Sequence, residues 1–182
     1  ALGYLGPSRC GSLGYAIADS EYAKITILVT DNLTQTELLQ PEIKGTNVDY
    51  IIVVNQIGDP QGIVSGTTAI TTHPIGVKIA RETARILDKL GYIKQGFSFQ
   101  SGAGGVSLRV TKEIQNMMIR RSITASFFSG GITTYHVAML EDNLVDTLYD
   151  VQCFDLEAVD SIAKNKNHIP ISASRYANPV DP

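Results

Sequence analysis

Charged residues, cysteines and long apolar runs are all scarce in this sequence, and each shortage excludes a class of protein. Charged residues make up 18% of the chain and hydrophobic residues 43%, which is too little charge for a disordered protein. The two cysteines, Cys10 and Cys153, are too few for a disulfide scaffold. We therefore expect a globular protein with a buried core, in a reducing cytoplasmic compartment.

The sequence also lacks a membrane-spanning run and a basic cluster. The longest apolar run, residues 50–54, has about five residues, whereas a span needs roughly 20, and no signal-peptide pattern opens the chain. Fifteen basic and 18 acidic residues give a net charge of −3, and no stretch concentrates lysine and arginine. We expect neither a membrane anchor nor a nucleic-acid partner.

Two apolar, β-branched segments in the first third of the chain, residues 25–30 and 49–55, predict buried strands. After them, residues 58–74 are rich in Gly, Thr, Ser and Pro and have no periodicity, which is typical of a connector. We therefore predict a domain boundary in this connector, with residues 1–60 in a first domain, residues 61–74 as a linker and residues 75–182 in a second domain.

From Pro74 onwards the pattern alternates between helices and strands. The first predicted helix begins at Pro74, stops before Gly91 and carries Ile75, Ile79, Ile86 and Leu90 near one face. Alternation implies right-handed crossovers, so we predict an α/β fold with a mostly parallel open sheet flanked by helices. Further helices are predicted at residues 106–121, 134–142 and 156–164, and strands at residues 97–101, 123–128, 144–149 and 169–172.

Two glycine-rich segments follow strands of this sheet, where open parallel sheets bind ligands. The first joins a strand to a helix, so unpaired backbone N–H groups and the helix dipole could bind an anion or oxyanion. The second follows the next strand in the same way. Neither matches a dinucleotide fingerprint or a P-loop, and a merely tight turn stays an alternative. The first segment consists of Gln100, Ser101, Gly102, Ala103, Gly104 and Gly105, and the second of Ser129, Gly130 and Gly131.

The sequence around the first segment, GFSFQSGAGGVSL at residues 96–108, resembles the signature of citrate lyase α subunits almost residue for residue. The resemblance extends forward through ITASF at residues 123–127 to YANP at residues 176–179, and backward to CGSLGYA at residues 10–16. It covers essentially the whole chain. It also implies a fragment, because family members have a longer first domain before Ala1 and a strand-rich segment after Pro182.

The resemblance implies a citrate CoA-transferase with a CoA-transferase-like fold of two related α/β domains. Such an enzyme transfers a thioester carrier from acetyl to citrate, giving citryl thioester and acetate. The implied carrier is a CoA-like prosthetic group, phosphoribosyl-dephospho-CoA, on the γ (acyl carrier) subunit, and acetyl-CoA is a substitute donor. The β subunit of citrate lyase would then cleave the citryl thioester.

The candidate site residues come mainly from the two glycine-rich segments. Gly104 and Gly105 are candidate catalytic donors to an oxyanion, each worth roughly 2.7 to 4 kcal/mol. Arg109, one turn into the following helix, is a candidate cation for citrate. No histidine has a metal-ligand partner at a useful spacing, so no metal is expected. The candidates for binding substrate or thioester are Gln100, Ser101, Gly102, Ala103, Gly130, Gly131 and Arg109.

Ser126 is the third catalytic candidate, by contrast with related CoA-transferases that carry a glutamate nucleophile at the corresponding position. No acidic residue occurs between Glu113 and Glu141, and a serine nucleophile would need an adjacent base, for which the sequence offers no obvious candidate. A small polar strand residue is the other interpretation of Ser126. We therefore expect citrate itself to attack the acetyl thioester, giving a mixed anhydride without a covalent enzyme intermediate.

Two other functions stay open at this point. One is a CoA-transferase or thioester hydrolase of another substrate class. The other is a non-catalytic acyl-CoA binding module, because a glycine loop before a helix can bind phosphate without performing chemistry.

Overall fold

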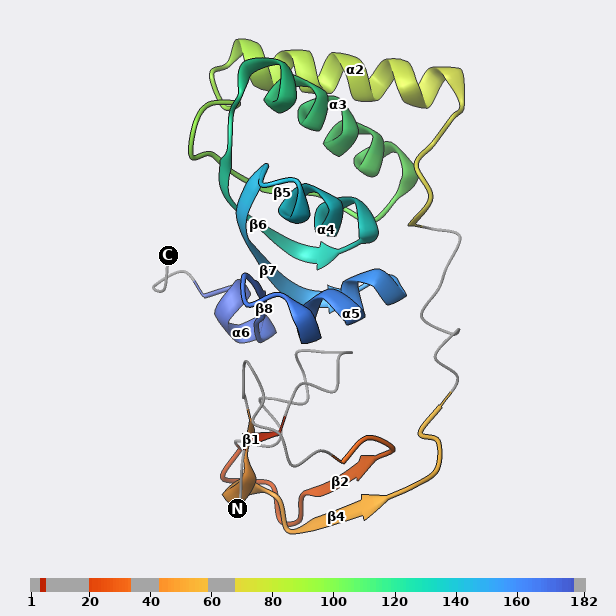
Figure 1. Cartoon of the computed structure of the whole chain (residues 1–182), viewed down its shortest axis with the longest axis vertical. Coiled ribbons are helices and arrows are strands. Elements are labelled where there is room, and N and C mark those ends of the chain that lie inside the picture. The colour runs from red at the N-terminus through yellow and green to blue at the C-terminus, as the bar shows by residue number, and fades with distance from the viewer. Residues whose placement is uncertain (1–3, 6–19, 34–42, 59–67, 179–182) are drawn as a thin grey trace.

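The computed structural model describes residues 4–5, 20–33, 43–58 and 68–178 of the chain, which form three sheets (Figure 1). Two of these sheets have two strands each and come from the first third of the chain. The third has four strands and comes from the rest. Cys10, and residues 61–67 of the predicted linker, lie outside the described residues.

The first region contains both predicted strands, but they are not buried. β2 (Ile27–Thr30) pairs in parallel with β4 (Tyr50–Val53), and β1 (Tyr4–Leu5) pairs antiparallel with β3 (Ile43–Lys44), which leads into the 3-10 helix Gly45–Asn47. All four side chains of β4 are exposed. The expectation of burial was wrong because, within the described residues, no helix packs extensively on β2 or β4.

The second region is built on a parallel sheet of four strands in the order β5-β6-β7-β8. Their order in the sheet is their order in the chain, as successive crossovers of one hand produce. This confirms the predicted α/β class with a parallel open sheet. The strands are β5 (Ser98–Gln100), β6 (Ala125–Ile132), β7 (Val145–Cys153) and β8 (His168–Pro170).

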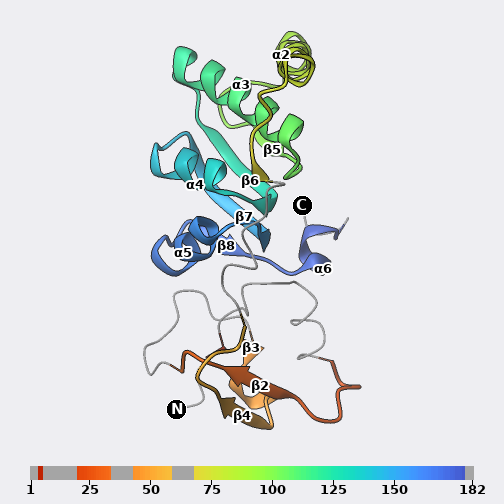
Figure 2. The same cartoon turned by 90° about the vertical axis from the view of Figure 1, so that its right-hand side faces the viewer.

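The helices of this region lie mainly on one side of the sheet. Figure 2 shows α4 and α5 together on one side and the short α6 on the other, while α2 packs against α3. The four longer helices agree with the predicted ones to within about one residue. They are α2 (Pro74–Lys89), α3 (Gly105–Arg121), α4 (Thr134–Glu141) and α5 (Leu156–Lys164). The short α6 (Ala173–Tyr176) was not predicted.

The face of α2 that packs against the domain differs from the predicted one. Pro74 stands in the first turn, and Gly91, with a φ of 76°, follows the end of the helix as predicted. The buried side of α2 is a stripe of small residues, Gly76, Ala80 and Ala84, at a spacing of four. Small residues let α2 approach α3 closely, and the larger apolar residues of the predicted stripe are left exposed.

The core lies between the sheet and α3, α4 and α5. Phe128 on β6 is almost fully buried and makes edge-to-face contacts with Phe97 and Phe99, at centroid distances of 6.1 and 5.7 Å. Ile114 and Met118 of α3 belong to the same cluster and are fully buried. This packing anchors both ends of the segment that joins β5 to α3.

The second glycine-rich segment lies inside a strand, which corrects the prediction that it forms a loop after one. β6 continues to Ile132 because β7 is long enough to pair with it. The register shifts at the glycines: Gly130 pairs with Asp150 but Gly131 pairs with Gln152, which is a β-bulge. Gly130 has a φ of 106°, which other residues rarely adopt.

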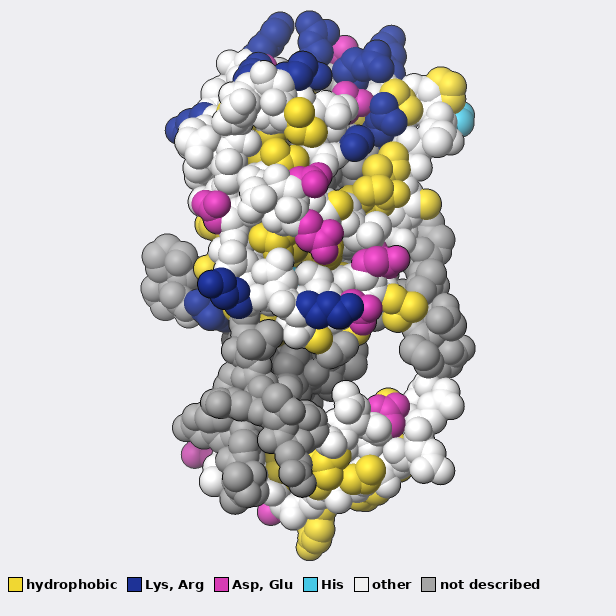
Figure 3. All heavy atoms as spheres, in the orientation of Figure 1, with side chains coloured by type: hydrophobic (Ala, Val, Ile, Leu, Met, Phe, Trp, Pro, Cys, Tyr) yellow, Lys and Arg dark blue, Asp and Glu magenta, His cyan; other side chains and the backbone are white. Residues whose placement is uncertain are grey.

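Lysine and arginine side chains gather on the surface over α2 and α3 (Figure 3). This clustering comes from the packing of two helices and not from a basic run in the sequence. Two of these cations are paired: Arg121 contacts Asp88 at 2.5 Å and Arg85 contacts Glu82 at 3.0 Å. In the part of the chain that the structure describes, no helix has the length and apolar character needed to cross a bilayer.

Candidate functional site

The first glycine-rich segment connects the carboxyl end of β5 to the first residue of α3. Gly104 is the N-cap of α3, with φ of −71° and ψ of 151°, and its carbonyl accepts the first helical hydrogen bond from the Leu108 N–H at 2.9 Å. Among the described residues no side chain caps this helix end. The N–H groups of the first turn of α3 therefore remain donors for a ligand.

The two candidate oxyanion glycines, Gly104 and Gly105, have different surroundings in the structure. Gly105 is packed against the chain before α2: its carbonyl accepts from the Thr71 N–H at 3.1 Å, and a Cβ would lie 2.9 Å from the Ala69 carbonyl. Gly104 has nothing within 4 Å of the place a Cβ would take. Close packing alone explains the glycine at 105, whereas the space beside Gly104 is open to a ligand.

Gln100 and Gly130 lie side by side where the two glycine-rich segments meet. The Gln100 Nε2 donates to the Ser101 carbonyl at 3.2 Å, and a Cβ at Gly130 would lie 3.1 Å from the Gln100 Cγ. Strand pairing aligns Gln100 with Ser129. The structure therefore brings the second segment next to the start of the first one, although Gly130 and Gly131 belong to a strand.

Ser101 forms a buried hydrogen bond with His136, which the sequence analysis did not single out. The Ser101 Oγ lies 3.0 Å from the His136 Nε2, and both residues are buried. The other ring nitrogen, Nδ1, lies 3.1 Å from both the backbone N and the Oγ1 of Thr133, the N-cap of α4. A Thr followed three residues later by a polar residue is the capping-box spacing, and this signal could have pointed to His136.

His136 is neutral at physiological pH. Burial, and after it the nearby His168, lower the pKa of its imidazole to about 4. The pair of Ser101 and His136 lies at the start of the glycine-rich loop. This is the carboxyl end of the strands, where an open parallel sheet is expected to bind a ligand.

Arg109 is held within its own helix. Its Nη2 and Nε lie 2.9 and 3.0 Å from the Glu113 Oε1, one turn further along α3. Gly102 faces Ser107, whose Oγ would lie 3.3 Å from a Cβ at 102. Ala103 is half-buried in the same loop. The role of these three residues in binding stays a prediction.

Ser126 lies near the amino end of β6, away from the loop. Its Oγ donates to the Phe97 carbonyl at 3.2 Å, and its N–H donates to the same carbonyl at 2.8 Å. Because Ser98 pairs with Phe127, Ser126 is level with Phe97, about 13 Å along the strand from Ser101. The structure does not bring Ser126 together with Gly104.

A second buried polar cluster stands at the end of β7. The Asp150 Oδ2 lies 3.0 Å from the Cys153 Sγ and 3.1 Å from the His168 Nε2, and all three residues are buried. Nearby, Asp155 caps α5 through the Ala158 N–H at 3.0 Å and accepts from the Thr134 N–H at 2.6 Å. Burial raises the pKa of the Asp155 carboxyl despite these two bonds.

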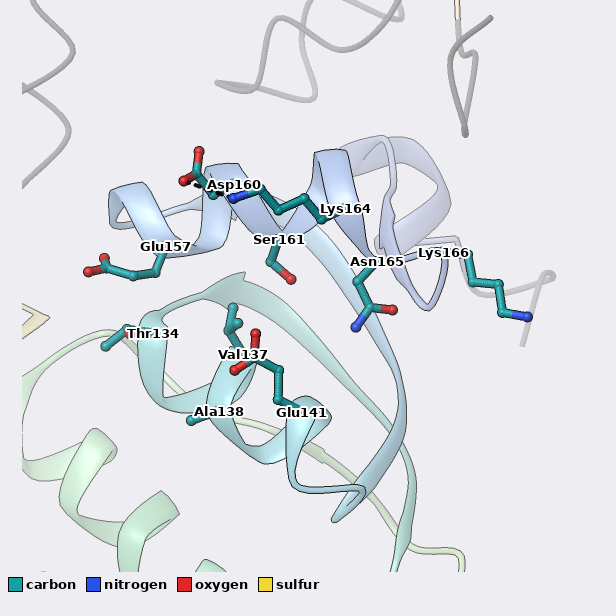
Figure 4. A pocket seen from close by; sticks show the side chains of 10 residues that line it. All are labelled: Thr134, Val137, Ala138, Glu141, Glu157, Asp160, Ser161, Lys164, Asn165 and Lys166. Atoms are coloured by element: carbon teal, nitrogen blue, oxygen red, sulfur yellow. Dashed lines mark ion pairs between the residues drawn. The ribbon is translucent and has the colours of Figure 1, made fainter.

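A shallow groove between α4 and α5 contains none of the predicted site residues (Figure 4). Its walls carry charges of both signs, and Asp160 and Lys164 form an exposed ion pair at 3.5 Å. Within residues 20–33, 43–58 and 68–178, no three His, Cys, Asp or Glu side chains come together in a way that could hold a metal ion. The glycine-rich loop is therefore the candidate site.

The fold and the loop define an α/β protein whose candidate ligand site lies at the carboxyl end of an open parallel sheet, beside an uncapped helix end. The chain belongs to the citrate lyase alpha subunit family (CitF), which matches residues 1–181. This confirms the resemblance seen around residues 96–108.

Individual relatives agree with this assignment. The chain is 45% identical over 179 residues to the citrate lyase alpha chain of Klebsiella pneumoniae and 44% identical over 178 residues to that of Escherichia coli. These alignments cover 98% of this chain but 35% of each relative. The chain thus spans about a third of the length of the curated relatives that it matches.

Two solved structures have a similar fold. A citrate lyase alpha subunit from Streptococcus mutans, in complex with citrate, superposes with a TM-score of 0.81 at 44% identity, over 99% of this chain and 36% of that one. A malonate decarboxylase alpha subunit from Acinetobacter baumannii superposes with a TM-score of 0.56 at 19% identity, over 92% of this chain and 32% of that one. The second likeness concerns the fold alone.

Proposed function

We propose that this chain forms part of a citrate CoA-transferase, which exchanges the acetyl group of a thioester for citrate within citrate lyase. The observation that carries the proposal is the open space beside Gly104, at an uncapped helix end, in a member of the citrate lyase alpha subunit family. The related Streptococcus mutans protein was solved in complex with citrate, which supports citrate as the acceptor.

The glycine-rich loop has the chemistry that acyl exchange needs. Both half-reactions pass through a tetrahedral species with negative charge on the former carbonyl oxygen. The N–H groups of the first turn of α3 are preorganised donors, and the positive end of the helix dipole favours the same charge. Gly104 leaves space for the substrate to approach these donors.

The proposed exchange proceeds by direct attack of citrate. A citrate carboxylate oxygen attacks the acetyl carbonyl carbon, the carbon–sulfur bond breaks, and the thiolate leaves. The resulting mixed anhydride is attacked by the thiolate at its citryl carbonyl, the anhydride bond breaks, and acetate leaves. Ser126 supports this route, because its hydroxyl is bonded to the Phe97 carbonyl and no general base is paired with it in the described structure.

The thioester would arrive as a substrate on another subunit. We propose phosphoribosyl-dephospho-CoA on a γ (acyl carrier) subunit as its carrier, acetyl-CoA as a substitute donor, and a β subunit as the enzyme that cleaves the product. A cytoplasmic location would suit these partners. The proposal draws on the family assignment together with a site that lies open at the helix end.

The test is acyl exchange by the full-length subunit, with acetyl-CoA as donor and a series of carboxylic acids as acceptors. We expect citryl-CoA to form and acetate to be released in equal amounts. Preference for another acid, or hydrolysis without exchange, would indicate a different thioester enzyme. Binding of CoA without binding of citrate would indicate a non-catalytic module.

A second measurement tests the direct attack. The subunit is incubated with acetyl-CoA alone and treated with hydroxylamine or borohydride. Its intact mass is then measured by mass spectrometry. Direct attack predicts an unmodified protein and sequential kinetics. A trapped acyl or CoA adduct, or ping-pong kinetics, would contradict the absence of a covalent enzyme intermediate.

A further inference from the structure

The hydrogen bond between Ser101 and His136 has a direction that the structure determines. We infer that the Nε2–H of His136 donates to the Ser101 Oγ, so that Ser101 turns its own hydroxyl hydrogen toward the ligand of the glycine-rich loop. Ser101 is then a hydrogen-bond donor to an anionic oxygen of the substrate, and His136 is the residue that positions it. The identity of that substrate rests on the function proposed above.

The Thr133 N–H determines which ring nitrogen of His136 carries the hydrogen. This backbone group can only donate, and it points at Nδ1 from 3.1 Å. Nδ1 must therefore present its lone pair. A hydrogen on Nδ1 would place two donors face to face in a buried environment, which is costly. In the neutral ring the hydrogen then resides on Nε2.

The neutral form of the ring follows from its surroundings. His136 is 2% exposed, and no carboxylate is hydrogen-bonded to either of its ring nitrogens in the described structure. Burial and the nearby His168 both lower the imidazole pKa, to about 4. A proton on both nitrogens would also break the bond that Nδ1 accepts from Thr133.

The direction of this bond excludes the nucleophilic role that a serine beside a histidine suggests. A general base must offer its lone pair to the hydroxyl hydrogen. Here Nε2 offers a hydrogen instead, so the Ser101 Oγ accepts and cannot be deprotonated by His136. In the serine–histidine pair of a hydrolase, the serine hydroxyl donates its hydrogen bond to the histidine. Here the direction of that hydrogen bond is reversed.

The remaining hydrogen of Ser101 is free for a ligand. Within the described part of the chain, its hydroxyl has no second hydrogen-bond partner besides His136. Ser101 opens the loop that ends at Gly104, where the first-turn N–H groups of α3 also lack a capping side chain. One hydroxyl donor and several backbone donors therefore belong to the same short loop, and together they suit a carboxylate or developing oxyanion.

The direction of the bond can be measured directly on the full-length subunit labelled with ¹⁵N-histidine. Long-range ¹H–¹⁵N spectra should show one histidine as the Nε2–H tautomer, unchanged between pH 8 and about pH 5, and this signal should vanish in His136→Gln. An Nδ1–H tautomer, or titration of this ring near pH 6.5, would overturn the inference.

Kinetics test the role of the hydroxyl. Ser101→Ala should lower kcat/KM for citrate by tenfold or more, while the protein folds normally. Ser161→Ala is the matched control, because Ser161 is as buried as Ser101, at 7% exposed, and lies in the groove between α4 and α5. If Ser101→Ala stays within twofold of the unmodified protein, Ser101 is not a donor to the substrate.

A double variant of Ser101 and His136 distinguishes a positioning role of His136 from a purely structural one. If His136 acts through Ser101, then His136→Gln in the Ser101→Ala background should cause little additional loss, whereas independent effects would multiply. Multiplying losses would overturn the positioning role. If the unmodified subunit shows no citrate exchange at all, the proposed function fails, yet the tautomer spectrum still decides the direction of the bond.

Discussion

The backbone of Gly131 lies against the aromatic ring of Phe154, so closely that a Cβ at position 131 would overlap the ring. Gly131 follows the register shift between β6 and β7, and Phe154 follows β7, where its N–H donates to the Ile132 carbonyl at 2.9 Å. The glycine is thus required by the packing of two neighbouring strand ends. This position differs in kind from Gly104, which has open space around it.

We expect Gly131→Ala to destabilise the protein by about 1 to 3 kcal/mol, because the ring or the strand must move to make room. Urea unfolding followed by circular dichroism measures the change. Gly104→Ala is the control: its φ of −71° suits any residue, so its free energy of unfolding should stay within about 0.5 kcal/mol of the unmodified protein. Equal losses in both variants would contradict the packing argument.

Gly104→Val should lower turnover by about a hundredfold while leaving stability nearly unchanged, because the side chain would fill the space in front of the α3 donors. The assay is citrate-dependent exchange by the full-length subunit, with thermal unfolding measured in parallel. The turnover of Gly104→Ala should lie between that of the unmodified protein and that of Gly104→Val. Near-normal turnover in a folded Gly104→Val variant would remove the loop from the mechanism.

Stability should depend on pH through His136. Its pKa is about 4 in the folded protein and near 6.5 in the unfolded chain, so the unfolded state binds the extra proton between these values. The free energy of unfolding should therefore fall as the pH drops from about 6.5 to about 4, by on the order of 3 kcal/mol.

His136→Gln provides the comparison for this pH dependence, because glutamine does not titrate. The difference in unfolding free energy between the unmodified protein and the variant should shrink as the pH falls from 6.5 to 4. Urea titrations at several pH values measure it. A difference that stays constant over this range would show that His136 is not buried in its neutral form.

Asp155→Ala should destabilise the protein by about 1 to 3 kcal/mol, because it leaves the Thr134 and Ala158 N–H groups without their acceptor. Asp160→Ala on the same helix is the control. Its exposed ion pair with Lys164 predicts a change below about 1 kcal/mol. Similar losses in the two variants, measured by thermal unfolding, would argue against a structural role for the Asp155 bonds.

The sequence by itself determined the longer helices of the second region and the family. α5 was predicted at residues 156–164, as observed, because the residue pattern that indicates a helix is local. The glycine-rich loop before α3 was recognised for the same reason, since its residues are contiguous.

The tertiary structure alone decided which faces and which distant residues meet. Gly130 and Gly131 belong to a strand because β7 extends far enough to pair with them. Small residues of α2 are buried instead of its larger ones because α3 lies close to them. Ser101 and His136 are 35 positions apart, and only the packing of α4 beside the end of β5 joins them. Local patterns specify elements, but partners across the fold decide burial, register and hydrogen-bond direction, because these depend on chain segments that the local sequence does not contain.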